Sequence, residues 1–273
     1  MDKLSKIIGE VEEDLKFIAT SGVRMKMLSS LLEKPKTSTE LKDEFKTGAS
    51  TIIHAARDLE KEGYIKEEID GYHLTTMGKI AILKLIEMAK TLYVLKKEKD
   101  FWLTHKIEDI PEEFITKFGE LQGLRRIKAT PTNLLQVLSL YIKMVGKSKV
   151  LQGVSPVFVS EFSKLVKKLI KKGGKVELVI SKDIKKPVLD SYQKEVDEEV
   201  KKRVREGKLR IWEIDNVGIA MSVSEQFLSI GFFNNDGTYD FTQDLVSYDK
   251  EAIEWGRKLF EYYKSRAKGI RLY

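Results

Sequence analysis

The most informative part of the sequence is residues 49–75, which read ASTIIHAARDLEKEGYIKEEIDGYHLT. Its first half carries apolar residues at three- and four-residue steps, and at about 100° per residue they share one helix face. They are Ala49, Ile52, Ala56 and Leu59. Gly63 then ends the helix as a left-handed cap. The spacing predicts a helix over residues 49–62 with one buried face.

A short β-hairpin is predicted after this helix. Residues 64–68 and 72–75 have the pattern of strands, and Asp70-Gly71 between them is a strong hairpin-turn signal. Upstream, apolar periodicity predicts helices over residues 4–18 and 25–32. Thr37 and Glu40 form a capping box that opens a further short helix. This order of helices and hairpin is typical of a winged helix-turn-helix domain, which we assign to residues 1–77.

The face of the 49–62 helix that lies opposite its apolar side is polar. Hydroxyl, imidazole and guanidinium groups on such a face suit phosphate oxygens and base edges in a DNA major groove. A solvated face is the ordinary interpretation of a single polar stripe, but the helix-turn-helix context and the hairpin favour DNA. For His73, a DNA-backbone contact and a plain exposed position remain equally compatible. The candidate DNA-binding residues are Lys36, Thr47, Ser50, Thr51, His54, Arg57, Lys61, Lys66 and His73.

A long helix is predicted from Met77 to Lys99. Its apolar residues spread beyond one face, so it must be covered on more than one side. We interpret residues 78–100 as a linker helix that also forms the contact of a homodimer, with residues 4–18 as an additional contact.

Residues 101–273 have the alternating pattern of an α/β domain. Strands are predicted at 149–154, 176–180 and 209–214, with helices at 133–145, 160–172 and 185–206 around them, which implies parallel pairing. Residues 217–223 and 227–233 resemble an antiparallel pair, and an amphipathic helix follows at 250–266. The overall fold class is therefore α+β / α/β, with an N-terminal winged helix-turn-helix, a long linker helix and a C-terminal α/β domain with a mixed sheet.

An effector site is predicted in this second domain, where the parallel strands end. Ser155 follows one strand, and Ser181 with Lys182 follows the next, each ahead of a helix. If the strands are parallel, these groups share one sheet edge and suit a small anionic or polyhydroxylated metabolite. The simpler interpretation is that both serines only cap helices. The alternative location for the site is among Asp215, Tyr239 and Asp240.

Composition excludes several kinds of functional site. The chain has 273 residues, no cysteine and three histidines, which excludes thiolate metal sites, disulfides and cysteine nucleophiles. Gly146-Lys147-Ser148 precedes a strand and lacks the earlier glycine of a phosphate-binding loop. Asp236, Asp240 and Asp244 are spaced like metal ligands but lack EF-hand register, so we interpret them as a turn with solvated acids. His105 is expected to be structural. We expect no catalytic site, no cofactor and no metal.

Charge is distributed unevenly along the chain. The formal net charge is +7, but residues 1–100 carry 18 basic and 18 acidic side chains, so the surplus lies in residues 101–273. This balance favours an alternative function, a winged helix used for protein contacts without sequence-specific DNA binding. The charged N-terminus has no signal-peptide core, and no apolar run reaches the roughly 18 residues of a membrane span. These features predict a cytoplasmic protein with no membrane partner.

Several stretches resemble known archaeal regulators. DLEKEGYI (residues 58–65) and DGYHLTTMGKIAI (residues 70–82) resemble winged-helix regulators of the ArsR/MarR-like type. Three further stretches resemble the middle-to-C-terminal domain of the methanogen filamentation-regulator family: FWLTHKIEDIPEEF, LQGVSPVFVSEF and IGFFNNDGTYDFTQDLVSYDKEAIEWGRKLFEYYKSRA. The resemblance implies a cytoplasmic, dimeric transcriptional regulator that binds double-stranded DNA and has a C-terminal regulatory domain for a small-molecule effector. The cysteine metal site of the ArsR type has no counterpart here.

Overall fold

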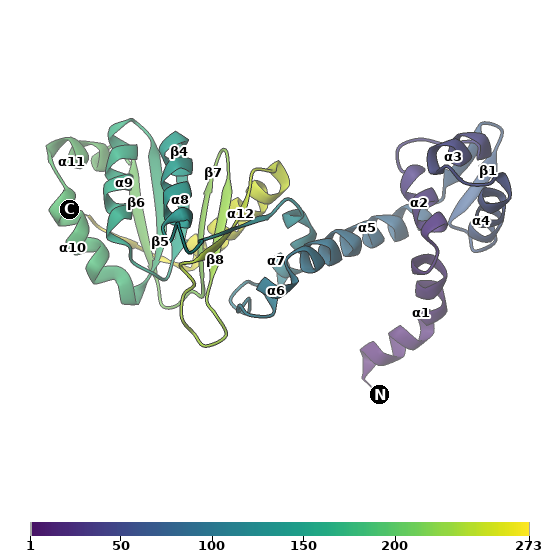
Figure 1. Cartoon of the computed structure of the whole chain (residues 1–273), viewed down its shortest axis with the longest axis horizontal. Coiled ribbons are helices and arrows are strands. Elements are labelled where there is room, and N and C mark those ends of the chain that lie inside the picture. Colours follow the sequence, from purple (N-terminus) through teal and green to yellow (C-terminus); the bar gives the residue numbers. More distant parts are fainter. Residues whose placement is uncertain (1, 273) are drawn as a thin grey trace. The chain divides into compact units, whose positions relative to one another are not determined.

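The fold is described from a computed structural model that covers residues 2–272. The chain forms two compact units, one ending at Ala89 and the other beginning at Lys90 (Figure 1). The boundary falls inside helix α5 (Thr76–Lys97), which is the long helix predicted from Met77 to Lys99. Within residues 2–272, no helix combines the length and the apolar content needed to cross a membrane.

The N-terminal unit has a winged helix-turn-helix fold. Its helices are α1 (Lys3–Ala19), α2 (Gly22–Ser30), α3 (Ser38–Phe45) and α4 (Ala49–Lys61), and the wing is formed by β1 (Ile65–Glu68) and β2 (Gly71–Leu74). The two wing strands are antiparallel, with Glu68 opposite Gly71. The helix predicted over 49–62, the hairpin and the turn at Asp70-Gly71 are all confirmed.

Local interactions explain where these helices begin and end. The Thr37 side chain accepts a hydrogen bond from the Glu40 backbone N–H, and the Glu40 carboxylate accepts one from the Thr37 N–H at 2.7 Å. The predicted capping box is thus confirmed. Gly63 has φ +75°, a left-handed conformation that favours glycine, and it follows the end of α4 as predicted.

The core of the N-terminal unit lies between α2, α3, α4 and the wing. Its fully buried residues include Met27, Leu28, Leu41, Ile52 and Leu59. The apolar face of α4 is rotated slightly from the predicted one, because Ala55 is buried and Ala49 is exposed. In α1 the only buried residue is Ile18, so most of its apolar face meets solvent.

The C-terminal unit is built on one eight-stranded sheet with the strand order β10-β6-β5-β4-β7-β8-β9-β3. The pairs β4/β5 and β5/β6 are parallel, and the remaining pairs are antiparallel, so the predicted mixed sheet is confirmed. The strands are β3 (Arg125–Lys128), β4 (Val150–Ser155), β5 (Lys175–Ser181), β6 (Leu209–Ile214), β7 (Ile219–Ser224), β8 (Leu228–Phe232), β9 (Gln243–Ser247) and β10 (Lys268–Ile270).

Helices cover both faces of this sheet. On one face, α12 (Lys250–Arg266) packs Trp255, Leu259 and Phe260 into a large core. The other face carries α8 (Gln136–Lys147), α9 (Ser160–Lys171), α10 (Lys185–Glu195) and α11 (Glu198–Arg205), which form a second core with strand residues such as Leu151 and Ile211. Short helices α6 (Lys99–Trp102), α7 (Glu112–Ile115), η1 (Phe118–Leu121) and η2 (Lys182–Ile184) complete the unit.

Two sequence predictions for this unit need correction. The single helix predicted over 185–206 is two helices, because Val196 is extended and the Asp197 side chain caps α11 by accepting from the Val200 N–H at 3.0 Å. The acids Asp240 and Asp244 are not solvated, since both are buried, and Asp244 lies within strand β9. Strands β3, β9 and β10 were not predicted.

Candidate functional site

The polar face of α4 is the first candidate site. Ile52, Ala55, Ala56 and Leu59 fix the helix against the core, which leaves the opposite face to solvent. The predicted residues Ser50, Thr51, His54, Arg57 and Lys61 are all exposed there, while Thr47 is half-buried in the preceding turn. The structure therefore brings six of the nine predicted DNA-binding residues to one helix and the turn that precedes it.

Only some of the polar and charged side chains on this face have a partner within the protein. Asp58, the acid among them, is paired with Arg24 of α2 at 2.7 Å, and Arg24 also donates to the Phe17 carbonyl at 2.8 Å. In contrast, no hydrogen bond or ion pair within residues 2–272 engages the side chains of His54, Arg57 or Lys61. The polar face of α4 thus presents unpaired donors while Asp58, the acid on that face, is neutralised. This arrangement suits anionic oxygens and base edges.

The wing has a different electrostatic character. Lys66 forms an ion pair with Glu68, and His73 Nε2 lies 2.7 Å from Asp70 Oδ1. The His73 contact and the Lys66 contact lower the pKa values of Asp70 and Glu68, respectively. Glu68, Asp70 and His73 lie close enough to share one cation, but their mutual pairing already accounts for the cluster. Lys66 and His73 therefore face neighbouring acids of the wing itself.

Lys36 is a correction to the predicted set. Its side chain is only 8% exposed, and its Nζ lies 2.9 Å from Glu44 and 2.7 Å from the Ser30 hydroxyl. The hydrogen bond to Glu44 raises the pKa of Lys36, so the lysine stays charged in this buried network. Its backbone also pairs with Tyr72 of the wing. Lys36 is a structural cation that joins α2, α3 and the wing, and it is not free to bind phosphate.

The effector residues predicted at the strand ends do not converge. The parallel register places Ser155 opposite Ile180, so Ser181 points to the other face of the sheet. The Ser155 hydroxyl bonds to the Val157 carbonyl at 2.7 Å, and Ser181 is buried. Lys182 meets the fully exposed Asp215 at 3.8 Å. The prediction of one shared site at this edge is therefore wrong. The simpler interpretation, that both serines cap helices, is not confirmed either, because neither serine side chain makes a capping hydrogen bond to the helix that follows it.

The alternative pair, Tyr239 and Asp240, does line a cavity. This cavity has a volume of about 430 Å³ and lies between the sheet and helices α8, α9 and α10. Ser155 lines it as well, whereas Ser181, Lys182 and Asp215 do not. The strongest signal for it in the sequence is the alternation of small and large residues in β7 and β8, which the effector prediction did not use.

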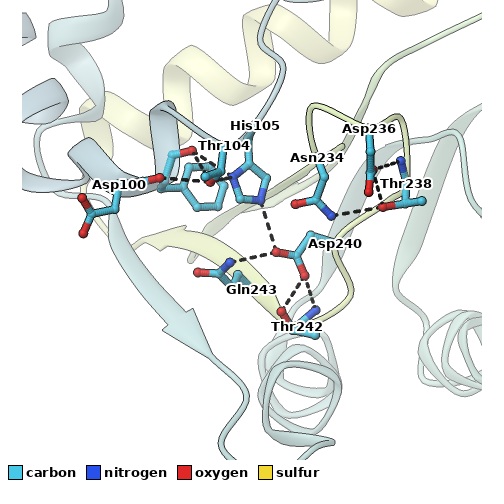
Figure 2. Close-up of polar contacts among 10 residues, drawn as sticks. Asp100, Thr104, His105, Asn234, Asp236, Thr238, Asp240, Thr242 and Gln243 are labelled. Carbon is cyan, nitrogen blue, oxygen red and sulfur yellow. Dashed lines mark hydrogen bonds and ion pairs between the residues drawn. The ribbon is translucent and has the colours of Figure 1, made fainter.

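Asp240 anchors the loop at one end of this cavity. Figure 2 shows its carboxylate at the centre of a hydrogen-bond cluster in which both oxygens accept from protein donors. Thr242 donates to Oδ1 from its backbone N–H at 2.8 Å, and Gln243 donates to Oδ2 at 2.8 Å. Burial raises the pKa of Asp240, but these hydrogen bonds together outweigh burial and keep it below the ordinary value. Asp240 is therefore an ionised structural group.

His105, which follows α6 in the chain, completes the cluster. Its Nε2 lies 3.2 Å from Asp240 Oδ2 (Figure 2). Its ring stacks on Phe101, and its Nδ1 contacts the Phe101 carbonyl at 2.9 Å. The side chain is buried and does not line the cavity. These contacts agree with the structural role expected for His105, which ties the 234–243 loop to the segment after α5.

The residues that sequence reasoning missed are Asp244, Ser229 and Gln243. All three line the cavity, and the Asp244 carboxylate accepts a hydrogen bond from the Ser229 hydroxyl. Burial raises the pKa of Asp244 to about 7, although the bond from Ser229 acts in the opposite direction. The cavity thus contains an acid that is partly protonated near neutral pH.

Two domain profiles from one protein family match the chain. The N-terminal domain of methanogenesis regulatory protein FilR1 matches residues 12–93, and the middle domain of the same protein matches residues 134–266. These two stretches together include most of both units. The chain belongs to the FilR1 family. Membership of the FilR1 family confirms the resemblance noted for residues 58–82 and for the C-terminal motifs.

A curated member of the FilR1 family extends beyond this chain. The methanogenesis regulatory protein FilR1 of Methanothrix harundinacea (strain 6Ac) is 27% identical over 258 residues, which cover 94% of this chain but 58% of that protein. This chain therefore spans little more than half the length of the relative that it matches.

Comparison with solved structures gives distant similarities. TrmBL2, an archaeal chromatin protein whose structure shows a novel mode of DNA binding, is 14% identical with a TM-score of 0.43, covering 98% of this chain and 100% of that chain. CalO1, a methyltransferase of calicheamicin biosynthesis, is 12% identical with a TM-score of 0.24, covering 79% of this chain and 67% of that chain. At these TM-scores neither similarity establishes a shared fold.

Proposed function

We propose that this protein is a transcriptional regulator that binds double-stranded DNA through α4. The observation that carries the proposal is the exposed face of α4, where His54, Arg57 and Lys61 have no ion-pair partner within residues 2–272. In a helix-turn-helix, the second helix enters the major groove with such a face toward the bases. Membership in a family of regulatory proteins supports this role, and chromosomal DNA as partner implies a cytoplasmic location.

The proposal assigns different tasks to the donors. Arg57 can form a bidentate contact with a guanine edge, whereas Ser50, Thr51 and Lys61 suit phosphate oxygens. Lys66 and His73 remain candidates for wing contacts, but each would have to exchange an intramolecular acid for a phosphate. The proposal therefore places most of the binding free energy on α4.

We also propose that the regulator is a homodimer. Helix α1 exposes Leu4, Ile7, Ile8, Val11 and Leu15, and α5 exposes Met77, Ile80, Leu83 and Met88. Apolar stripes of this length are typical of surfaces that pair with a partner, and a second copy of the chain is the partner that two operator half-sites require. A two-fold dimer would double the few cationic contacts that one winged helix offers.

We further propose that the C-terminal unit senses a small-molecule effector. Its cavity of about 430 Å³ lies within the size range of ligand pockets. A ligand in the cavity can change DNA affinity only if the ligand-bound and ligand-free proteins bind DNA differently. The proposal therefore requires a measurable change in operator affinity when the ligand binds.

The rival function is a protein-interaction module. The balanced charge of residues 1–100 and the acidic wing favour it, because both weaken attraction to DNA phosphates. The two functions differ in their response to salt. Binding that neutralises phosphates loses affinity as salt rises, with a log–log slope of about −0.9 per contact on duplex DNA.

A gel-shift titration of the full chain separates these functions. The probe is the DNA upstream of its own gene, with unrelated DNA of the same length as control and salt as the variable. We expect a shift that favours the upstream DNA and weakens steeply with salt. Absence of a shift at low salt would support the interaction module instead.

A further inference from the structure

The cavity of the C-terminal unit originates in the side-chain pattern of three central strands. Gly153, Ser222 and Ser229 are neighbours across β4, β7 and β8, and Ala220 is opposite Gly231 in the adjacent row. All five line the cavity. The alternate residues of the same strands, such as Met221 and Ile230, are large and belong to the core under α12. Small side chains on one face of the sheet thus leave an unfilled space below α8–α10.

The walls of this space are mostly apolar. They are formed by Leu178 and Ile180 of β5, by Phe162, Val166 and Ile170 of α9 and by Val188 of α10. Apolar side chains also remain exposed along the lining: Leu134 is 74% exposed, Leu135 is 64% exposed and Phe241 is 57% exposed. Exposed apolar groups beside an apolar cavity are expected where a hydrophobic ligand enters, because the ligand would cover them.

One end of the cavity carries hydrogen-bond acceptors that lack donors. Asp244 is only 9% exposed, and while one of its carboxylate oxygens is bonded to Ser229, Oδ1 has no partner within residues 2–272. The Gln243 Oε1 atom is likewise without a donor in this part of the chain. A buried acceptor without a donor is costly, and a ligand that supplies an N–H or O–H would remove that cost.

Tyr239 sets the shape of the polar end. Its hydroxyl lies so close to Gly231 that a Cβ added to the glycine would overlap it. The ring therefore occupies this position only because residue 231 has no side chain. The absence of a side chain in β8 thus both opens the cavity and orients one of its polar residues.

The charges around the cavity indicate which ligands it excludes. The charged or titratable side chains that line it are Lys167 of α9, Glu195 of α10, Asp240 and Asp244, together with the phenols of Tyr141, Tyr192 and Tyr239. Lys167, the cation among them, is held by Glu195 at 3.5 Å and Asp197 at 3.3 Å. The polar end therefore has acids without a free cation, which disfavours an anionic ligand.

We propose that this cavity binds one small molecule with a largely apolar body and an uncharged or cationic head that donates a hydrogen bond to Asp244. The inference deepens the effector-sensing role proposed above by naming the ligand class, and it replaces the anionic or polyhydroxylated metabolite predicted from the strand ends. The buried Asp244 oxygen that lacks a donor favours a ligand head with an N–H or O–H group, and the apolar walls of the cavity favour an apolar ligand body.

A matched pair of fluorescent probes tests this class directly. N-phenyl-1-naphthylamine is an uncharged aromatic amine with one N–H donor, and 8-anilino-1-naphthalenesulfonate has the same skeleton with a sulfonate added. Each is titrated into the full chain without DNA. We expect saturable one-to-one binding of the amine and binding of the sulfonate that is at least about tenfold weaker.

Variants locate the binding within the cavity. Ala220→Leu adds volume to the floor and should weaken amine binding at least about tenfold, whereas Ala89→Leu, at an exposed position of α5, should leave it unchanged. At pH 8, where Asp244 is mostly ionised, Asp244→Asn removes the buried charge but keeps an acceptor, so the preference for the amine over the sulfonate should shrink severalfold. Asp215→Asn removes an exposed charge outside the cavity and should leave that preference unchanged.

The outcomes distinguish this inference from the proposed function. The inference is overturned if the amine does not saturate, if the sulfonate binds as tightly as the amine, or if Asp244→Asn leaves the preference intact. The comparison of Asp244→Asn with the natural chain remains a valid test even if Ala220→Leu fails to fold. If the amine binds as expected but the full chain shifts no DNA, the ligand class stands and the proposed DNA-binding function fails. If DNA is shifted but the amine does not bind, only the inference fails.

Discussion

Arg57 is the side chain on α4 best suited to read a base. It is exposed and unpaired within the described residues, and its guanidinium can donate two hydrogen bonds to one guanine. Replacing it with alanine should weaken operator binding by about 1–3 kcal/mol and relax specificity at one base pair. Fluorescence anisotropy with single-base operator variants measures both effects. Arg205→Ala removes an exposed arginine from α11 and serves as the control; an equal loss in both variants would contradict a specific contact.

Lys36 should matter for stability rather than for DNA binding. Lys36→Met removes the cation from Glu44 and Ser30 and leaves their oxygens near the core, which should lower the free energy of unfolding by about 1–3 kcal/mol. Chemical denaturation followed by circular dichroism measures this loss. Lys34→Met, at an exposed neighbouring lysine, should change stability little. A reduced salt dependence of DNA binding in folded Lys36→Met would show instead that this lysine contacts phosphate.

Asp244 should make the stability of the C-terminal unit depend on pH. Burial raises its pKa from 3.8 to about 7, so the folded state holds this proton more tightly than the unfolded state. Stability contributed by the proton is complete below about pH 4 and is lost as the pH rises toward 7. Asp244 interacts electrostatically with Tyr141 and with Tyr239, and Tyr239 also interacts with Asp240. Both tyrosines titrate well above this pH window.

The Asp244→Asn variant tests this linkage. It should be more stable than the natural chain at pH 8, by at most about 4 kcal/mol, and nearly equal to it at pH 4. Thermal unfolding by calorimetry across this pH range measures the difference. A constant difference between the two proteins at every pH would contradict the assignment.

Sequence reasoning succeeded for exposed residues and failed for buried polar ones. The positions of Ser50, His54 and Arg57 followed from helical periodicity, because an amphipathic helix has one solvent face. Lys36 and Asp244 were misjudged because charged residues are usually exposed, and the burial of these two depends on partners on other elements, such as Glu44 of α3 and Ser229 of β8. Such partners become visible only when the tertiary fold is known.

Elements with strong local signals were predicted well. Helix α4, the capping box of α3, the Asp70-Gly71 hairpin and α12 carry their own periodicity, cap or turn residues. Strands β3, β9 and β10 were missed because each pairs with a strand distant in sequence or with a single neighbour at the sheet edge. The split between α10 and α11 was missed because Val196 interrupts the helix without glycine or proline.

The exposed apolar face of α1 should mediate dimerisation. Ile7→Glu with Val11→Glu places two charges on that face and should convert a dimer to a monomer at tens of micromolar, because a buried carboxylate opposite its own copy is unfavourable. Light scattering coupled to size exclusion measures the mass. Lys3→Glu, on the same helix but not part of the apolar set, is the control. A monomeric natural chain at that concentration would contradict the proposed dimer.

At the scale of the whole molecule, the two units divide the proposed work. The N-terminal unit has the helix that we propose to read DNA, and the C-terminal unit has an open eight-stranded sheet with a cavity on one face. The mixed architecture was predictable because alternating strands and helices imply parallel pairing. The cavity was not, since it depends on the register that aligns small residues of β4, β7 and β8.

The central claim is that the α4 face binds operator DNA, and its most direct test is the dissociation constant of a triple variant, Ser50→Ala with His54→Ala and Arg57→Ala. These side chains are exposed and should not alter folding, which the thermal transition of the N-terminal unit verifies. Affinity for the upstream DNA is measured by anisotropy at fixed salt. We predict that the variant binds at least about 100-fold more weakly than the natural chain, since each contact contributes roughly 1 kcal/mol or more. An unchanged dissociation constant in the folded variant would contradict the assignment of α4 as the recognition helix.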